Sequence, residues 1–417
     1  TYIGFDTNTQ SFAFQQYDRN VLTRIGPGSY QLLSGDGSRM IFSQSDGSSG
    51  STRNIFLTEE MDPQGNALTF DYDTNFCLTR ITDAIGQVTT LTYGLASSNI
   101  QSGPVVSVVP ADPYKLTKVT DPFGRFATLN YEPQLIGEVI TASSTNLIYG
   151  WGLASITDEI GITSQFGYYS VETRTSPVIY QDGNFVDSLT TPYGTTYFST
   201  NADNGTTRSM EITYPDGSRE RVEYNQGNTN QSNFDPASAI PTGMLTTDGL
   251  LQYRDTYYWD REACAMANGD YSKARLYHFL HTESLGLTAG AVESMKPPLE
   301  GRVWYDYSGQ SSSVVIAPST LPAHIGRVLD DGTTQLYTYG YNAFGHVTNS
   351  IDPLGRTLSF LYDTNGIDLL EVRQTRGGNN ELLAKMAYNS QHLPVTLIDA
   401  AGQATKCSYN ARGQMLS

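Results

Sequence analysis

The sequence predicts a mainly β protein built from repeated antiparallel hairpins, and three observations lead to this prediction. A glycine is followed seven residues later by a tyrosine eight times along the chain. In six of these units an aspartate stands three residues before the glycine. Where two units run back to back the spacing is 21 residues, as from Tyr72 to Tyr93. A repeat of this length indicates a stacked architecture in which no unit buries its apolar face alone.

The repeated positions are the candidate structural residues of the chain. They are Asp62, Gly65 and Tyr72; Asp83, Gly86 and Tyr93; Asp121, Gly124 and Tyr131; Asp158, Gly161 and Tyr168; Gly217 and Tyr224; Gly332 and Tyr339; Asp352, Gly355 and Tyr362; and Asp399, Gly402 and Tyr409.

One unit, residues 341–362, shows what the pattern means physically. Its Asp-Pro-Leu-Gly segment from Asp352 to Gly355 has the composition of a type I turn, because aspartate caps the first position and proline presets the second. A second turn, from Asn342 to Gly345, lies about half a unit away. Runs rich in Thr, Val, Leu and Tyr between the turns favour short strands. Each unit is therefore predicted to be a hairpin with one tyrosine-rich face and one polar face.

The stretch between the repeat regions breaks this pattern. Residues 259–267 contain helix formers without strand alternation, and Asp270 can cap a second helix through Tyr271, Ala274, Tyr277 and Leu280. We therefore predict three parts: an N-terminal repeat sheet over 1–254, a small helical insert over 255–300, and a C-terminal repeat region over 301–417.

The segments Thr-Asp-x-x-Gly at 82–86, 120–124 and 157–161, and the segment Tyr-Asp-x-x-Gly at 362–366, resemble the RHS/YD-repeat family. The resemblance covers roughly residues 30–250 and 300–417. It implies a continuous antiparallel sheet that spirals into a hollow shell or extends as a scaffold. Members are secreted, surface-bound or toxin-delivery proteins of bacteria, with the teneurin-like adhesion receptors of animals as relatives.

Two features differ from the toxin-releasing members of that family. Such members end in a self-cleaving aspartate motif built around Asp-Pro-x-Gly, whereas here Tyr362 follows Asp352–Gly355 at the ordinary repeat distance. We interpret this segment as a plain repeat turn. The chain also ends a few residues into a new unit that opens at Tyr409, so we expect it to be part of a longer or processed protein.

Composition narrows the possible functions. The net charge of −17 argues against nucleic-acid binding, which requires a basic surface. Cys77, Cys264 and Cys407 are too few and too scattered for a disulfide framework or a zinc site. Two of them could still form a single disulfide bridge. No run of 18 apolar residues is present, so no membrane span is predicted.

Several side chains could also carry chemistry. His278 and His281 are three apart on the predicted second helix, with Glu283 nearby, and could share a metal, but the His-Glu-x-x-His pattern is absent. The aspartates could act in pairs as in glycosidases, yet a ladder of equivalent residues fits turn capping better. Calcium could bind at 201–205 or 330–332. Trp259 and Trp304 could form a carbohydrate platform.

The sequence therefore favours a non-enzymatic scaffold, secreted or displayed at the cell surface, without cofactor or metal. Expected partners are further repeats of the same protein, a homo-oligomer or polymer, and an encapsulated polypeptide cargo. A glycan or a protein at a cell surface is the expected partner if the chain is an adhesin-like module. A metal-dependent hydrolase centred on the insert is the third alternative.

Overall fold

The structure is a computed structural model that describes residues 2–13, 18–49, 53–102, 105–140, 145–169, 185–203, 207–227, 240–245, 251, 253–281, 288–311 and 319–417. The chain divides into two compact units. Unit 1 comprises Thr1–Thr69, Glu223–Tyr258 and Asp270–Ser417, and unit 2 comprises Phe70–Val222 and Trp259–Gly269. Strands β5, β17 and β18 cross the division.

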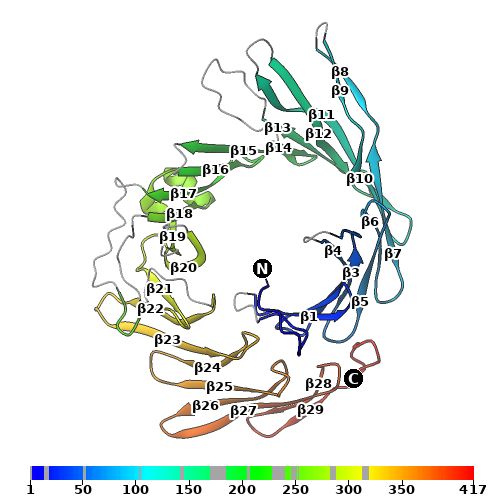
Figure 1. Cartoon of the computed structure of the whole chain (residues 1–417). Helices are drawn as coiled ribbons and strands as arrows, with labels where there is room; N and C mark the ends of the chain where they lie inside the picture. Colours follow the sequence, from blue (N-terminus) through cyan, green and yellow to red (C-terminus); the bar gives the residue numbers. More distant parts are fainter. Residues whose placement is uncertain are drawn as a thin grey trace. The chain divides into compact units, whose positions relative to one another are not determined.

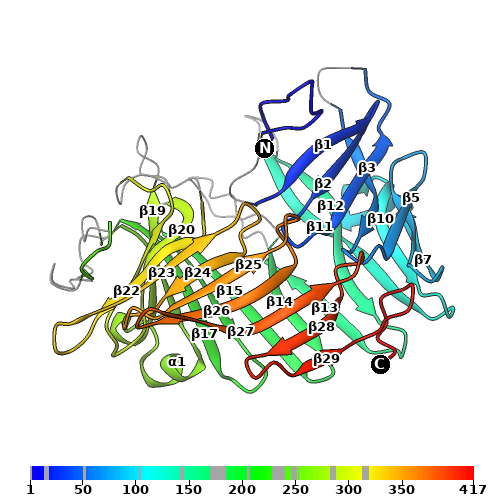
Figure 2. The same cartoon turned by 90° about the horizontal axis from the view of Figure 1, so that it is seen from below.

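Nearly all regular structure is antiparallel β-sheet, as predicted. The described strands form one sheet of 27 strands and one separate hairpin, β8–β9. Most strands pair with the next strand along the chain (Figures 1 and 2). Where β8 and β9 intervene, β7 pairs with β10 instead. The prediction of a mainly β fold made of consecutive hairpins is confirmed.

The first strands along the chain, up to the one that crosses the first division, are β1 (Val21–Gly26), β2 (Ser29–Leu33), β3 (Arg39–Ser45), β4 (Ile55–Met61) and β5 (Ala67–Tyr72). Those that follow are β6 (Leu78–Thr82), β7 (Val88–Leu95), β8 (Ser98–Ser102), β9 (Val105–Val109), β10 (Asp112–Thr120), β11 (Phe126–Ile140), β12 (Thr145–Thr157), β13 (Thr163–Tyr168), β14 (Val186–Thr191), β15 (Gly194–Asp203), β16 (Thr207–Thr213) and β17 (Arg219–Gly227).

The remaining elements begin with β18 (Tyr253–Trp259), the helix α1 (Arg261–Ala267) and the 3₁₀ turn η2 (Tyr271–Lys273). They continue with β19 (Arg275–His281), β20 (Thr288–Lys296), β21 (Val303–Tyr307), β22 (Pro322–Val328), β23 (Thr334–Tyr341), β24 (Val347–Ile351), β25 (Thr357–Tyr362), β26 (Leu369–Arg376), β27 (Asn379–Tyr388), β28 (Pro394–Asp399) and β29 (Ala404–Lys406).

The helix predicted over 259–267 is present as α1, capped by the Asp260 carboxylate, which accepts from the Ala263 amide. The second predicted helix is wrong, because most of that segment is strand β19. Its buried residues Ala274, Leu276, His278 and Leu280 recur at every second position, which is the period of a strand. The division of the chain at 254 and 300 stays a prediction.

The fully buried side chains gather mostly in β18 to β21 of unit 1. A small apolar core there contains Leu280, Ala289, Ala291 and Tyr307. The hairpins elsewhere bury their residues only partly, as the burial pattern of β24 shows. A repeat sheet with half-buried faces depends on its turns and hydrogen bonds more than on an apolar core.

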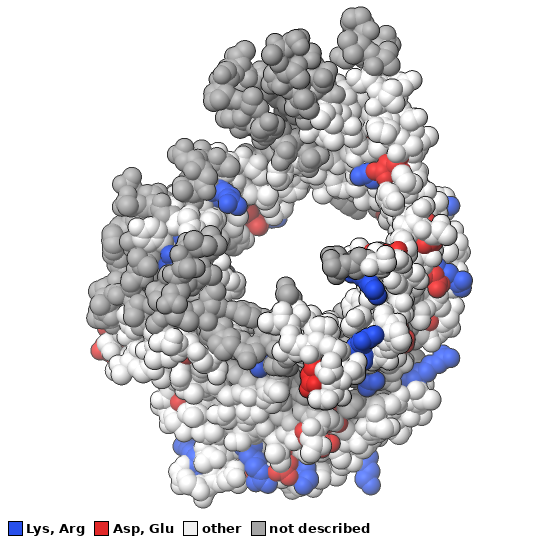
Figure 3. All heavy atoms as spheres, viewed as in Figure 1, with Lys and Arg blue, Asp and Glu red and all other residues white. Residues whose placement is uncertain are grey.

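Charged side chains of both signs are scattered among many uncharged ones on the face seen in Figure 3. No basic stripe is visible among the described residues on that face. No described helix combines the length and the apolar character needed to cross a membrane.

Candidate functional site: the turn ladder and a buried ionic cluster

The Asp-x-x-Gly segments form one kind of hairpin turn, and Asp121 shows its geometry. The Gly124 amide donates to the Asp121 carbonyl at 3.1 Å, which closes a four-residue turn. The Asp121 carboxylate accepts from the amides of Phe123 and Arg125, both at 2.9 Å. Gly124 has a φ of +83°, so the hairpin is a type I turn followed by a bulge glycine.

The same arrangement recurs along the ladder. In each of the other five units the aspartate accepts from the amide four residues on: Asp62, Asp83, Asp158, Asp352 and Asp399. The remaining repeat glycines also have positive φ: Gly65, Gly86, Gly161, Gly217, Gly332, Gly355 and Gly402. The Asp352–Gly355 segment thus has the geometry of an ordinary repeat turn.

Two of the turn aspartates also bind an arginine. Arg125 Nη2 lies 2.6 Å from an Asp121 carboxylate oxygen, and Arg356 Nε lies 2.6 Å from Asp352. Partial burial favours the neutral acid in each case, but the hydrogen bonds from the arginine and the backbone outweigh it and lower the pKa of both aspartates. These carboxylates therefore serve as acceptors for the backbone and arginine donors of their own turns.

Replacing Gly124 with valine should lower the free energy of unfolding by about 1–2 kcal/mol, because a β-branched residue tolerates positive φ poorly. No atom lies within 4 Å of a Cβ built at Gly124, so the expected loss comes from the backbone alone. Urea unfolding followed by circular dichroism measures it. Gly290→Val is the matched control, since Gly290 is equally open, lies in strand β20 and lacks positive φ. An unchanged midpoint for Gly124→Val would contradict the turn geometry.

The repeat tyrosines have a role that their spacing did not reveal. The Tyr131 hydroxyl donates to the Leu116 carbonyl at 2.9 Å, and the Tyr168 hydroxyl donates to Leu153 at 2.8 Å. Each acceptor stands just before an extra residue at which the strand register shifts. Such a bulge interrupts the ladder of backbone hydrogen bonds. The tyrosine of the following strand supplies the missing donor.

The same combination of a bulge and a tyrosine donor occurs at three further positions. Tyr307 donates to the Val292 carbonyl, Tyr341 to Pro322 and Tyr409 to Pro394, and a register shift follows each acceptor.

Burial raises the pKa of the other repeat tyrosines Tyr72, Tyr93 and Tyr362. The Tyr224 hydroxyl contacts the side chains of Gln226 and Thr288.

Replacing Tyr131 with phenylalanine should destabilise unit 2 by about 1–2 kcal/mol, because the Leu116 carbonyl would lose its donor in a partly buried place. The ring itself is retained, so packing changes little. Tyr114→Phe is the control, since Tyr114 is 62% exposed. Equal urea midpoints for the two variants would show that the hydroxyl carries no stability.

In unit 1, hairpin turns from the two ends of the chain pack against one another. Gln391 Nε2 donates to the Gln64 carbonyl at 3.2 Å, and Arg19 Nη2 donates to Ser319 Oγ at 2.6 Å. A Cβ at Gly35 would lie 2.5 Å from the Phe344 carbonyl oxygen. Segments 300 or more residues apart in the sequence are thus joined within unit 1.

Unit 1 also contains a cluster of buried charges at β18 to β22. His278 is fully buried, with Nδ1 2.9 Å from Asp255 Oδ1 and Nε2 3.2 Å from Glu293 Oε2. A second pair joins His324 Nδ1 to Asp306 Oδ1 at 2.7 Å. This cluster is not predicted from the sequence, in which the spacing of the neighbouring residues places His278 on a helix.

Two irregularities turn these charges inward. Asp255 stands opposite His278, and His278 stands opposite Ser294. Glu293 is the extra residue of a bulge, so Glu293 and Ser294 are consecutive and both buried. Arg254 has a φ of +58°, and Arg254 and Asp255 are likewise both buried.

The charges balance within the cluster. Burial alone disfavours the imidazolium of His278, but the hydrogen bonds and charges of Asp255 and Glu293 outweigh it and raise the pKa of His278. Burial lowers the pKa of Arg254, and the charges of Glu293 and Asp255 oppose this change. His278 and Arg254 thus lie with Asp255 and Glu293 in one buried cluster, in which the carboxylates favour the charged form of the imidazole.

The structure corrects two of the site hypotheses. Trp259 and Trp304 are both fully buried, so a carbohydrate platform on these rings is wrong. His278 and His281 lie on a strand rather than on one face of a helix, and both ring nitrogens of His278 face carboxylates. No group of three His, Cys, Asp or Glu among the described residues is arranged to hold a metal. Glu283 and residues 204–205 lie outside the described residues.

The remaining hypotheses concern the acidic loop at 330–332 and the cysteines. Asp331 accepts from the Thr333 amide at 2.9 Å and from its hydroxyl at 2.6 Å, as a turn aspartate does. Cys77, Cys264 and Cys407 are free thiols, and burial raises the pKa of Cys77 and Cys264.

No family model and no curated protein matches this chain. Among solved structures, a crystal structure of TcdB2-TccC3 without its hypervariable C-terminal region matches at 10% identity with a TM-score of 0.38, covering 95% of this chain and 21% of that one. The Tc holotoxin pore of Photorhabdus luminescens matches at 10% identity and 0.36, covering 95% and 24%. A porin-like protein of Bacteroides uniformis matches at 13% identity and 0.15, covering 87% and 85%. The chain spans about a fifth of the toxin chains, and at these TM-scores we draw no conclusion from the likenesses.

Proposed function

We propose that this chain is a non-enzymatic structural scaffold of RHS/YD-repeat type, part of a secreted or cell-surface bacterial protein. In this proposal the hairpin ladder encloses a polypeptide cargo or extends as an assembly with further repeats or copies. The observation that carries the proposal is the use of the repeated polar groups. The aspartates accept backbone amides and several repeat tyrosines donate to backbone carbonyls, so the repeat builds a sheet instead of a reactive site.

The end of the sheet supports assembly. Strand β29 (Ala404–Lys406) is exposed along its whole length and pairs on one side with β28. An exposed edge strand can pair with another chain or with a further hairpin. Further repeats or a second copy would complete it.

Electron microscopy of the intact parent protein tests the proposal. A hollow particle or a fibre containing this region would support a scaffold. A compact globule with no repeat wall and no extended form would contradict it.

A second candidate function, binding of a glycan or a partner protein, is favoured by one groove. Its volume is about 360 Å³, and Tyr337, Tyr339, Ser350, Asp352 and Gln374 are among its lining residues. Tyr337 is 40% exposed, so its ring could stack on a sugar. A glycan array tests this candidate. Binding that is abolished by Tyr337→Ala and unchanged by Tyr197→Ala would support it. If the chain binds no glycan on the array, a glycan is excluded as the ligand.

A further inference from the structure

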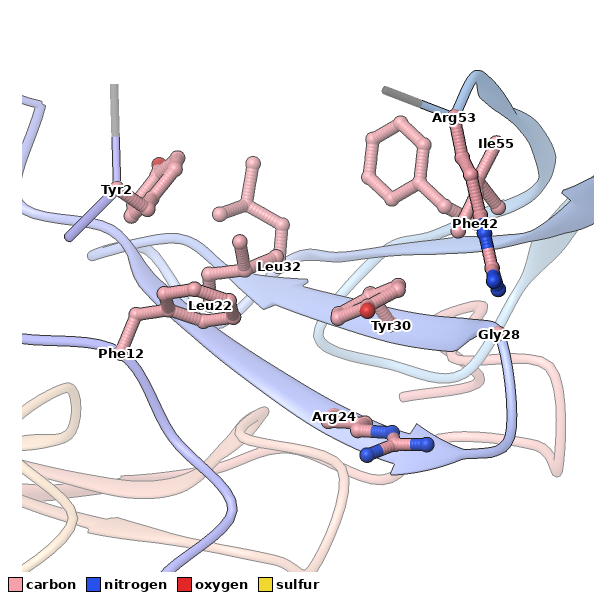
Figure 4. A pocket seen from close by; sticks show the side chains of 10 residues that line it. All are labelled: Tyr2, Phe12, Leu22, Arg24, Gly28, Tyr30, Leu32, Phe42, Arg53 and Ile55. Atoms are coloured by element: carbon pink, nitrogen blue, oxygen red, sulfur yellow. The ribbon is translucent and has the colours of Figure 1, made fainter. Parts of the chain in front are cut away.

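A groove on the N-terminal sheet of unit 1 has the properties of a ligand site. It lies on β1 to β3 and the start of β4, and its volume is about 770 Å³ (Figure 4). Pockets of about 300–1,000 Å³ hold small organic ligands. All of its lining residues belong to unit 1.

One end of the groove is apolar. Leu22 on β1 stands directly opposite Leu32 on β2. The Phe12 amide donates to the Leu22 carbonyl at 2.9 Å, which fastens the N-terminal segment along β1. The Phe12 ring lies 6.3 Å from the Tyr30 ring. This end is therefore a preformed apolar surface with ordered walls.

The other end carries two guanidinium groups. Arg24 stands opposite Tyr30, and Tyr30 stands opposite Phe42, so an arginine and two rings form one row across three strands. Arg53 precedes β4, and in Figure 4 Arg24 and Arg53 lie toward Gly28, away from Phe12. Phe42 and Ile55 lie beside Arg53 in Figure 4, so both guanidinium groups border apolar side chains of the groove.

Neither arginine is neutralised by a carboxylate that the structure describes. Arg24 donates to the Gly26 carbonyl at 3.2 Å, and no ion pair joins Arg24 or Arg53 to a described Asp or Glu. The chain has 42 acidic and 25 basic residues, whereas the described lining of this groove contains two arginines and no aspartate or glutamate. Paired guanidinium groups favour a carboxylate, which they can bind with two hydrogen bonds each.

We propose that this groove binds an amphipathic organic anion with a single carboxylate head and an unbranched apolar tail. The head would lie between Arg24 and Arg53, and the tail would run over Tyr30 toward Leu22 and Leu32. The ligand is a free acid in solution rather than a lipid in a bilayer, since the groove is a hollow in a sheet face and not a protruding apolar surface. This site is independent of the scaffold function.

Isothermal titration of the whole chain with octanoate tests the proposal. We expect saturable binding that weakens as salt is added, and a loss of at least about tenfold in the Arg24→Gln, Arg53→Gln double variant. Arg39→Gln is the matched control. Arg39 and Phe42 are three positions apart on β3, so they lie on opposite faces of the sheet and Arg39 faces away from the groove. Equal affinity in the double variant and the control, or no octanoate binding to the unmodified chain, would overturn the proposal.

Two further measurements examine the tail and the source of the anion. Affinity should rise about fourfold per methylene from hexanoate to octanoate, and 1-octanol, which lacks the charge, should bind more weakly. Equal binding of octanol and octanoate would overturn the role of the arginines. Vesicles of phosphatidylcholine and phosphatidylglycerol should not co-sediment the protein. Co-sedimentation without octanoate binding would assign the groove to a membrane surface and overturn the free-acid ligand.

Discussion

Replacing Asp255 with alanine is expected to destabilise unit 1 by about 3–5 kcal/mol, the typical loss when one partner of a buried ion pair is removed. Asp255 is 1% exposed, and its loss would leave His278 and Arg254 facing Glu293 alone. The expected result is a lower urea midpoint in circular dichroism. Asp71→Ala is the matched control, because Asp71 forms an exposed ion pair with Arg80 at 3.9 Å, and exposed pairs contribute about 0–1 kcal/mol.

The same cluster predicts how stability depends on pH. The folded pKa of His278 is raised above its ordinary value. The stability that protonated His278 contributes to the fold is therefore fully present below the pKa of about 6.5 in the unfolded chain. It is lost as the pH rises through the pKa of His278 in the folded chain. The urea midpoint of unit 1 should fall across that interval, and a variant with Asp255→Asn and Glu293→Gln should lose this slope. The same slope in both proteins would show that His278 is not charged in the folded chain.

Replacing Trp304 with alanine is expected to cost about 3–5 kcal/mol, as for other buried aromatic side chains. Trp304 is fully buried, and the Arg302 guanidinium lies 5.6 Å from its ring centroid. Removal would create a cavity and also expose one side of Arg302, which donates to Ser294 Oγ at 2.9 Å. Trp304→Phe, which keeps a ring face for the guanidinium, should cost less.

Thermal and urea unfolding of these Trp304 variants measure the effect. Tyr193→Ala is the control, since Tyr193 is 82% exposed and surface substitutions change stability by about 0.5 kcal/mol or less. A loss for Trp304→Ala no larger than that of the control would contradict the buried position of the ring.

Local turn chemistry explains why the hairpins could be predicted from the sequence. The turn at Asp121–Gly124 depends on its own residues: an aspartate that accepts nearby amides and a glycine at positive φ. The bulges could not be predicted in the same way. The extra residue after Leu116 has no distinctive identity, so the partner of the Tyr131 hydroxyl became visible only through the strand register.

The ionic cluster was missed for a related reason. His278 occupies an inward position of β19 between Leu276 and Leu280, where a strand pattern would require an apolar residue. Its partners lie on other strands and depend on the bulge at Glu293 and on the positive φ of Arg254. A signal was present in two adjacent charged residues, Arg254 and Asp255, within a strand whose other residues are mostly aromatic.

The most direct test of the structural role of the repeat is a series at one turn: Asp158→Asn, Asp158→Ala and Gly161→Val, compared by urea midpoint. The Asp158 carboxylate accepts from the Ile160 and Ile162 amides at 3.0 and 2.8 Å, and an asparagine oxygen can accept the same bonds. We predict a midpoint close to that of the unmodified chain for Asp158→Asn, and losses of about 1–2 kcal/mol for each of the other two. A large loss in Asp158→Asn, or no loss in the other two variants, would contradict the conclusion that the repeated aspartates and glycines build hairpins.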